Sequence, residues 1–208
     1  MAEKHINWFA LEKACAKPGC PVCTIVRDRS ARYIDNMLFE HVSDRGFRER
    51  YRNALGFCPD HARSLESYRD GLAVAILGED ILSHVLPDLN RGKATKVRDE
   101  CPACAETARV EREFLGFLAE SEDQALKDFF TASEGLCVPH YRALVTSVKK
   151  VPRWLREFHE RRFEELLRRT RNFIEFSAWG RQDDFAALSP EDKVVWKEIA
   201  RSLRGAAD

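Results

Sequence analysis

Apolar residues recur every three or four positions along most of the chain, and this spacing is typical of amphipathic helices. No stretch alternates apolar and polar residues over the length of a strand, so we expect no β-strand. The predicted fold class is therefore all-α. The apolar stripes predict helices around residues 22–38, 65–89, 110–118, 155–174 and 190–203.

Breaks between these stripes suggest how the chain is organised. Residues 90–100 are polar and basic, which is typical of a linker, and the Val151-Pro152 step interrupts the pattern again. Ser189-Pro190-Glu191-Asp192 has the capping serine, the proline and the early carboxylates of a helix start. We expect a first helical repeat over 1–92, a second over 93–180, and a C-terminal helix within 181–208 that packs on both.

An internal repeat supports this division. The Cys-Pro-Val-Cys motif at 20–23 returns as Cys-Pro-Ala-Cys at 101–104, an offset of 81 residues. The Gly-Phe-Cys-Pro-Asp-His motif at 56–61 returns as Gly-Leu-Cys-Val-Pro-His at 135–140, an offset of 79. The two sequence halves therefore follow one plan, in which the second motif comes after the helix that the first motif begins.

Each half supplies three cysteines and one histidine, which is the ligand set of a tetrahedral zinc site. A proline after the first cysteine suits the first position of a helix, so the helix amides would point toward the thiolates. The glycines before the second motif suit left-handed turns that reverse the chain toward the metal. We expect two zinc ions, one in each half, with the ligands Cys20, Cys23, Cys58 and His61, and Cys101, Cys104, Cys137 and His140.

Several alternatives stay open at this stage. Pairing within each half closes the shorter loops and is our expectation, but each Cys-Pro-x-Cys pair could instead meet the second motif of the other half. Iron–sulfur clusters could replace zinc, and the spacing of Cys15, Cys20, Cys23 and Cys58 is similar to that of plant-type ferredoxins. The residue that matches Cys15 in the second half is Lys96, which favours a packing role for Cys15. Free buried thiols, and a zinc–thiolate redox switch, are the remaining interpretations.

Composition and charge narrow the function classes. The 208 residues carry 34 basic and 34 acidic side chains, so the net charge is zero and nothing indicates a general nucleic-acid binder. The longest apolar run, 72–77, is too short for a membrane span, and polar residues at 3–5 disfavour a secretory signal. We therefore expect a cytoplasmic protein, in which cysteines serve as metal ligands more often than as disulfides.

Two oppositely charged runs lie in the second half. Residues 149–171 have a net charge of +5, and residues 111–134 have a net charge of −5. Attraction between these two runs, within one chain, explains both without a nucleic acid or a lipid surface. Within the basic run we expect helical pairs four residues apart, namely Glu157 with Arg161, Glu164 with Arg168 and Glu165 with Arg169.

The motifs that mark common enzymes are missing from the sequence. It has no phosphate-binding glycine loop, no dinucleotide fingerprint and no Gly-x-Ser-x-Gly elbow. The other histidines, at positions 5, 41, 84 and 159, have no cysteine at ligand spacing. We therefore favour a non-enzymatic interpretation and name no catalytic residue.

The duplicated motifs, together with Phe173-Ile174-Glu175-Phe176, Ser189-Pro190-Glu191 and Trp196, resemble a bacterial domain-of-unknown-function family. The resemblance extends over residues 6–203 and supports the metal ligands, but it implies no established activity. The function we expect is that of an interaction or regulatory scaffold with structural zinc and a protein partner. An iron–sulfur electron-transfer or sensor protein is the alternative.

Overall fold

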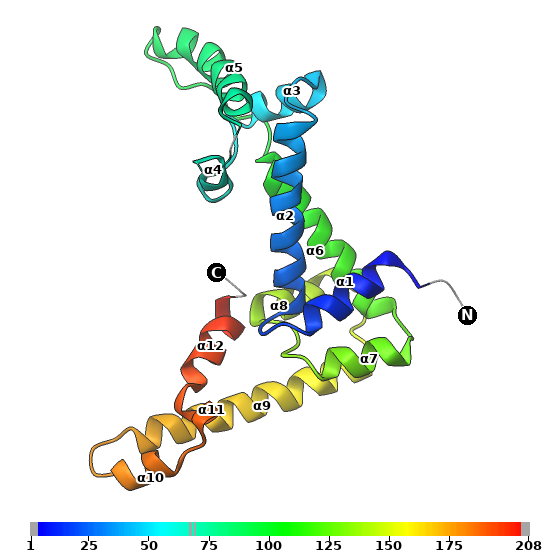
Figure 1. Cartoon of the computed structure of the whole chain (residues 1–208), viewed down its shortest axis with the longest axis vertical. Helices are drawn as coiled ribbons and strands as arrows, with labels where there is room; N and C mark the ends of the chain where they lie inside the picture. Colours follow the sequence, from blue (N-terminus) through cyan, green and yellow to red (C-terminus); the bar gives the residue numbers. More distant parts are fainter. Residues whose placement is uncertain (1–3, 67, 69, 205–208) are drawn as a thin grey trace. The chain divides into compact units, whose positions relative to one another are not determined.

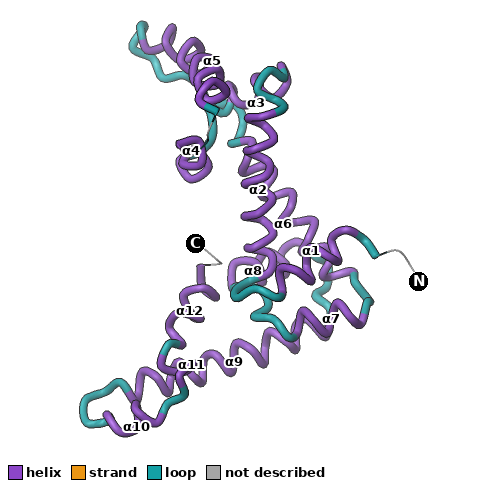
Figure 2. Tube along the Cα trace, viewed as in Figure 1, coloured by secondary structure: helices purple, strands orange, loops and turns teal. Residues whose placement is uncertain are grey.

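The computed structural model describes residues 4–66, 68 and 70–204, and these residues form twelve helices and no strand (Figures 1 and 2). The all-α prediction is confirmed. The last four residues of the expected C-terminal range, 181–208, lie outside the described residues. The helices are α1 Ile6–Cys15, α2 Pro21–Phe39, α3 Arg45–Asn53, α4 Pro59–Glu66, α5 Gly71–Leu89, α6 Pro102–Glu120, α7 Gln124–Thr131, α8 Val138–Ser147, α9 Arg153–Phe176, α10 Gln182–Ala187, α11 Pro190–Lys193 and α12 Val195–Arg204.

The helices belong to two compact units. The first unit consists of Met1–Ile25 and Glu111–Asp208, and the second is Val26–Val110. Helix α2 therefore begins in the first unit and ends in the second, and α6 begins in the second and ends in the first. The repeats expected from the sequence, 1–92 and 93–180, do not coincide with these units. Which stretch of the chain folds on its own stays a prediction.

The second unit is built around a core to which α2, α3, α5 and α6 all contribute. Phe47 of α3 and Leu77 of α5 are almost fully buried in it, next to Leu38 near the end of α2. A buried ion pair joins α3 to α5, because Asp80 accepts hydrogen bonds from Arg48 at 2.9 Å and from Arg52 at 3.1 Å. Asp80 is buried, whereas both arginines are partly exposed, so removing the arginines would leave the Asp80 charge uncompensated in the core.

The first unit has its own core, in which Phe130 of α7 packs against Trp154 and Phe158 of α9. Helix α1 packs against α7, and α12 packs against both α8 and α9 (Figure 1). The α12 contact is held by Glu198, whose carboxylate accepts hydrogen bonds from Arg162 at 2.8 Å and Arg169 at 2.7 Å. The largest fully buried side chains of the first unit include Leu11, Phe114, Leu115, Leu118, Leu126, Phe130, Leu136, Leu144 and Leu155.

The basic run forms ion pairs that differ from the expected ones. Glu134 of the acidic run does lie 3.7 Å from Arg162, but Arg169 pairs with Glu198 and with Asp192 rather than with Glu165. Arg162 and Arg169 pair with carboxylates of α11 and α12 because these carboxylates are half-buried against α9. Charges there are less screened by water than charges on the exposed face of α9. Within the exposed face the pairs are three or four residues apart but not the expected ones: Arg153–Glu157 and Glu165–Arg168.

Two predicted helices are each divided. The stripe over 65–89 becomes α4 and α5, because the Asp70 side chain caps α5 by accepting hydrogen bonds from the amides of Leu72 and Ala73. Ser189 caps a helix as predicted, through a bond from the Asp192 amide, but α11 ends at Lys193 and α12 begins at Val195. The apolar period continues across both breaks, so periodicity alone did not reveal them.

Candidate metal centres

The eight predicted ligands lie in two groups of four in the part of the chain that the structure describes. In each group, one donor atom from every residue lies within 4.8 Å of the donor atoms of the other three. We name the groups after their first cysteines. The Cys20 centre consists of Cys20, Cys23, Cys137 and His140, and the Cys58 centre consists of Cys58, His61, Cys101 and Cys104.

Each centre lies where two helices start, α2 and α8 at the Cys20 centre and α4 and α6 at the Cys58 centre. Cys20, Cys58, Cys101 and Cys137 each directly precede a helix, and the carbonyl of each accepts the hydrogen bond that begins it. The second ligand of every motif comes three residues later and therefore lies on the same side of the first helical turn. Because the amide groups of a helix N-terminus carry partial positive charge, four such starts favour the thiolate form of these cysteines. The prediction that the two Cys-Pro-x-Cys motifs begin helices is confirmed.

Glycines turn the chain into the second motif of each half, as the sequence suggested. Gly56 has φ +94° and Gly135 has φ +66°, both in the left-handed region that favours glycine. The Gly56 amide also donates to the Tyr51 carbonyl at 2.8 Å, which satisfies the end of α3 before the chain reaches Cys58.

Within the Cys20 centre the donor atoms surround a common point. The Nδ1 atom of His140 lies 3.4 Å from the sulfur of Cys20, and 3.1 Å from the sulfurs of Cys23 and of Cys137. The Cys23 and Cys137 sulfurs are 3.6 Å apart. On the other side of the ring, Nε2 of His140 lies 3.7 Å from a carboxylate oxygen of Glu111. This distance is too long for a hydrogen bond, so the carboxylate acts on the imidazole through its charge alone.

The Cys58 centre repeats this arrangement. Nδ1 of His61 lies 3.2 Å from the Cys58 sulfur, 3.4 Å from the Cys104 sulfur and 3.7 Å from the Cys101 sulfur. The Cys58 and Cys104 sulfurs are 3.6 Å apart. Around a tetrahedral zinc, neighbouring sulfurs are about 3.8 Å apart and sulfur and nitrogen about 3.6 Å apart. Both sets of donor atoms therefore fit one such ion without rearrangement of the backbone.

The pairing of the motifs corrects our expectation. Each Cys-Pro-x-Cys pair meets the Cys-x-x-His motif of the other sequence half, not that of its own half. Each centre nevertheless belongs to one compact unit, the Cys20 centre to the first and the Cys58 centre to the second.

Helix length explains why pairing within a half fails. Helices α2 and α6 both have 19 residues, so each carries the chain about 28 Å from the motif that begins it. The short helices that follow, α3 and α7, have nine and eight residues, and at about 14 Å and about 12 Å they are too short to return the chain to that motif. The entropic advantage of the shorter loop is about 1 kcal/mol and does not compensate for unwinding a helix.

The thiols of each centre do not share one pKa. Burial raises the pKa of Cys20 well above its usual range, while hydrogen bonds with Cys137 and Cys20 lower that of Cys23. Burial opposes protonation of His140, but hydrogen bonds to the Cys137 and Cys23 sulfurs raise its pKa to about 10. The four donors therefore include one thiol of low pKa, together with a thiol and an imidazole that keep their protons. A bound cation would replace these protons.

In the Cys58 centre, too, the pKa values of the cysteines shift in opposite directions. Burial raises the pKa of Cys104 to about 12. Burial also opposes the charge on Cys58, but hydrogen bonds from the His61 backbone and the Cys104 and Cys101 thiols lower its pKa. Burial lowers the pKa of His61, which favours the neutral imidazole that a metal requires.

Cys15 belongs to neither group of donors. Burial raises its pKa to about 12, against a hydrogen bond with Ser133 that lowers it, so the thiol stays protonated. The ferredoxin-like set is also not assembled, because Cys58 lies in the centre that contains neither Cys20 nor Cys23. The interpretation of Cys15 as a packing residue agrees with its position on α1, beside the buried Leu11 and Ala14.

Sequence reasoning missed the residues around the Cys20 centre. Glu111 lies two turns beyond Cys104 on α6, and nothing in the sequence indicates that it contacts His140 instead. Arg201 and Ser202 of α12 line a small cleft together with Cys20 and Cys137. These contacts depend on which helices pack together, which the periodicity of a single sequence does not give.

Four protein ligands complete the coordination of a tetrahedral ion, so neither centre leaves a position for a substrate or a catalytic water. The chemistry that such an ion supplies is structural, since it joins two helix starts. None of the helices in the described ranges combines the length and apolar character that a bilayer span requires.

Comparison with known proteins places the chain in a family. An uncharacterised 23.9 kDa protein of the xynA 3′ region in Caldicellulosiruptor sp. (strain Rt8B.4) is 31% identical over 141 residues, which cover 64% of this chain and 68% of the relative. No solved structure matches the chain. The pattern of DUF6062, a family of unknown function, matches residues 2–113, just over half of the 208 residues. The chain thus belongs to this family of unknown function, DUF6062.

Proposed function

We propose that this protein binds two zinc ions, one in each centre, and that it acts as a cytosolic interaction or regulatory scaffold whose fold these ions stabilise. The observation that carries the proposal is the arrangement of the donors, three sulfurs and one imidazole nitrogen at the spacing of a single tetrahedral ion. In this role the ions join helix starts and take no part in turnover.

The donor spacing also favours a single ion over a cluster. The four protein ligands of an iron–sulfur cluster are divided among two or four iron atoms, so not all of them can lie as close together as the ligands of one ion. Here the sulfurs of the Cys23–Cys137 and Cys58–Cys104 pairs lie 3.6 Å apart. Zinc is the borderline-soft ion that three thiolates and one imidazole suit best in a closed site.

Elemental analysis of the untagged, anaerobically purified chain, with a visible spectrum, tests the metal. We expect two equivalents of zinc and a colourless protein. A brown protein that absorbs near 400 nm and contains iron would support the cluster alternative and contradict the proposal. Cys58→Ser should lower both the zinc content and the thermal midpoint; an unchanged melting curve would show that the ion is not structural.

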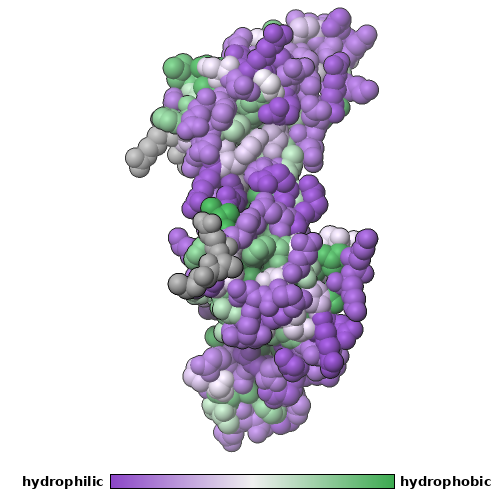
Figure 3. Space-filling view, turned by 90° about the vertical axis from the view of Figure 1, so that its right-hand side faces the viewer, coloured by the Kyte–Doolittle hydropathy of each residue, from purple (hydrophilic) through white to green (hydrophobic). Residues whose placement is uncertain are grey.

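Exposed leucines on α5 support the scaffold part of the proposal. Leu72, Leu82, Leu86 and Leu89 are between 56% and 71% exposed and recur at helical spacing, forming what we call the α5 leucine face. A protein surface is otherwise largely polar, as the face in Figure 3 is, and apolar rows of this kind mark protein interaction sites.

A photo-crosslinking residue tests this surface. Placed at Leu86 in the producing cell, it should yield a discrete crosslinked species, whereas the same residue at the exposed Arg63 should not. Equal crosslinking from both positions, or from neither, would contradict a specific scaffold surface on α5.

A further inference from the structure

The two centres differ in how far their ligands are removed from water. Cys20 and Cys137 are only 3% and 2% exposed, whereas all four ligands of the Cys58 centre are half-buried. A dissolved oxidant can therefore approach the sulfurs of the Cys58 centre directly. In the Cys20 centre, Cys23 is the one cysteine that is not fully buried.

The surroundings reinforce this difference. In the first unit α12 packs against α8, and its residues Arg201 and Ser202 line the cleft beside Cys20 and Cys137. The Glu111 carboxylate lies 3.7 Å from the outer nitrogen of His140. Helix α12 therefore covers one side of the Cys20 centre and limits the access of solvent to Cys20 and Cys137.

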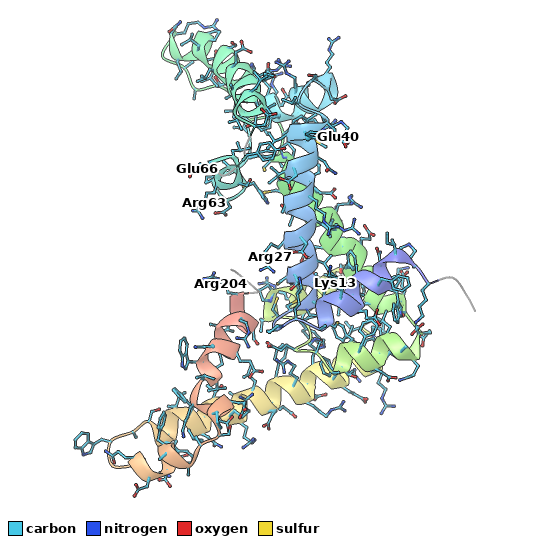
Figure 4. The ribbon with its side chains drawn as sticks, in the orientation of Figure 1. Lys13, Arg27, Glu40, Arg63, Glu66 and Arg204 are labelled. Carbon is cyan, nitrogen blue, oxygen red and sulfur yellow. The ribbon has the colours of Figure 1, made fainter. Side chains whose placement is uncertain are left out.

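Helix α4, which supplies Cys58 and His61 to the other centre, is held much more weakly. It has no buried residue, and only Ala62 and Leu65 rest partly on the core of the second unit. Its side chains Arg63 and Glu66 extend outward, as Figure 4 shows. Bonds to a metal would therefore provide much of what fixes this helix.

From these differences we propose that the Cys58 centre is a peroxide-sensitive zinc–thiolate switch, and that the Cys20 centre retains its ion as the structural site. The inference rests on the proposed function, because it requires a zinc ion in each centre. It adds that only one of the two ions is regulatory.

The chemistry is a two-electron oxidation of two thiolates by hydrogen peroxide. The Cys58 sulfur attacks the peroxide, an S–O bond forms as the O–O bond breaks, and the leaving hydroxide takes up a proton to become water. The Cys104 sulfur, 3.6 Å away, then attacks the Cys58 sulfur, so that an S–S bond forms and a second hydroxide leaves and is protonated. His61 and Cys101 alone hold the zinc ion too weakly, and it dissociates.

The oxidised form keeps what is needed for reversal. The new disulfide still connects α4 to α6, so the two helix starts stay close when a dithiol reduces the bond. Thiol–disulfide exchange returns both electrons to the cysteines, and zinc can bind again.

Stepwise peroxide treatment of the full-length, two-zinc protein tests the proposal. A chromophoric chelator follows zinc release, and peptide mass spectrometry after alkylation identifies the disulfides. We expect one equivalent of zinc to leave at least tenfold faster than the second, together with a Cys58–Cys104 disulfide, and to return after dithiol and zinc are added. A Cys15→Ser variant should behave identically, since Cys15 is not a ligand.

Three results would overturn the switch. These are release of both equivalents at one rate, a Cys23–Cys137 disulfide that forms first, or loss of one equivalent without any disulfide in the Cys58 centre. Failure of the proposed function looks different, because the purified chain would then hold no zinc before any oxidant is added.

Discussion

At the scale of single residues, His159 shows how the chain supports a ligand without supplying one. Its ring is fully buried among aromatic side chains, Nδ1 lies 2.7 Å from the Leu155 carbonyl, and Nε2 accepts a hydrogen bond from the Leu136 amide at 2.9 Å. This second bond fixes the backbone directly before Cys137. Burial lowers the pKa of His159 to about 4, so the ring is neutral at physiological pH.

This pKa makes stability depend on pH. The ordinary pKa of histidine is 6.5, so between pH 6.5 and 4 the unfolded chain binds more protons at this site than the folded one. The contribution of His159 to the free energy of unfolding should therefore fall by about 2 kcal/mol from pH 7 to pH 5.

His159→Phe isolates this effect. The variant should be less stable at pH 7, because the Leu136 amide loses its acceptor. The difference in free energy of unfolding between the variant and the unsubstituted protein should become about 2 kcal/mol smaller at pH 5. Urea unfolding of both proteins in the same excess of zinc measures this difference, since titration of the ligands is then common to both. A difference that does not change with pH would contradict the neutral, buried ring.

Gly135 is a second residue on which the Cys20 centre depends. A Cβ atom there would lie 2.6 Å from Cε1 of Phe158 and 3.2 Å from Nε2 of His159, and its φ of +66° is already costly for alanine. We expect Gly135→Ala to lower the free energy of unfolding by about 3 kcal/mol or more. Gly92→Ala is the matched control, since φ there is +65° and nothing lies within 4 Å, so it should cost about 1 kcal/mol. Equal losses in thermal or urea unfolding would show that packing at Gly135 is unimportant.

At the scale of elements, the sequence predicted those features that local chemistry decides. The prolines after Cys20 and Cys101 correctly marked the starts of α2 and α6, and Ser189 correctly marked a capped start. The sequence could not predict features that depend on which helices pack together. The charged partners of Arg169 come from α11 and α12, and no local pattern identifies them.

Helix α4 provides a prediction at this scale, because it has no buried side chain and starts at two of the candidate ligands, Cys58 and His61. If zinc binds there as we propose, its removal by a chelator should raise amide hydrogen exchange in α4 at least tenfold more than in α8. Helix α8 starts at the other centre, but it also buries Leu144 and packs against α12. Exchange mass spectrometry with and without chelator measures both helices in one experiment. Equal increases would mean that packing holds α4 as firmly as it holds α8.

At the scale of the whole molecule, the pairing of the motifs connects the two sequence halves. All eight candidate ligands come from the repeat, because residue type and spacing are local, and the structure gathers them into two groups of four. Their distribution between two ions could not, because it depends on the lengths of α2 and α6 and on where α3 and α7 lead. Loop entropy favours neighbours in sequence by only about 1 kcal/mol, which is too little to decide between two such folds.

Crossed pairing can be tested in the intact chain with Cys137→Ser. If Cys137 shares an ion with Cys20 and Cys23, that ion is lost or weakened, and these two thiols should become at least tenfold more reactive toward an alkylating reagent. Cys101 and Cys104, in the same sequence half as the substitution, should stay protected by the ion that we propose in the Cys58 centre. Peptide mass spectrometry after a brief alkylation under native conditions reads every cysteine at once.

The matched variant Cys58→Ser should give the reverse pattern, exposing Cys101 and Cys104 while Cys20 and Cys23 stay protected. Pairing within a half makes the opposite prediction for both variants, so the two arrangements cannot be confused. Loss of protection at all cysteines in either variant would mean that the two centres do not hold their ions independently. A selective pattern would instead show that each ion joins one sequence half to the other.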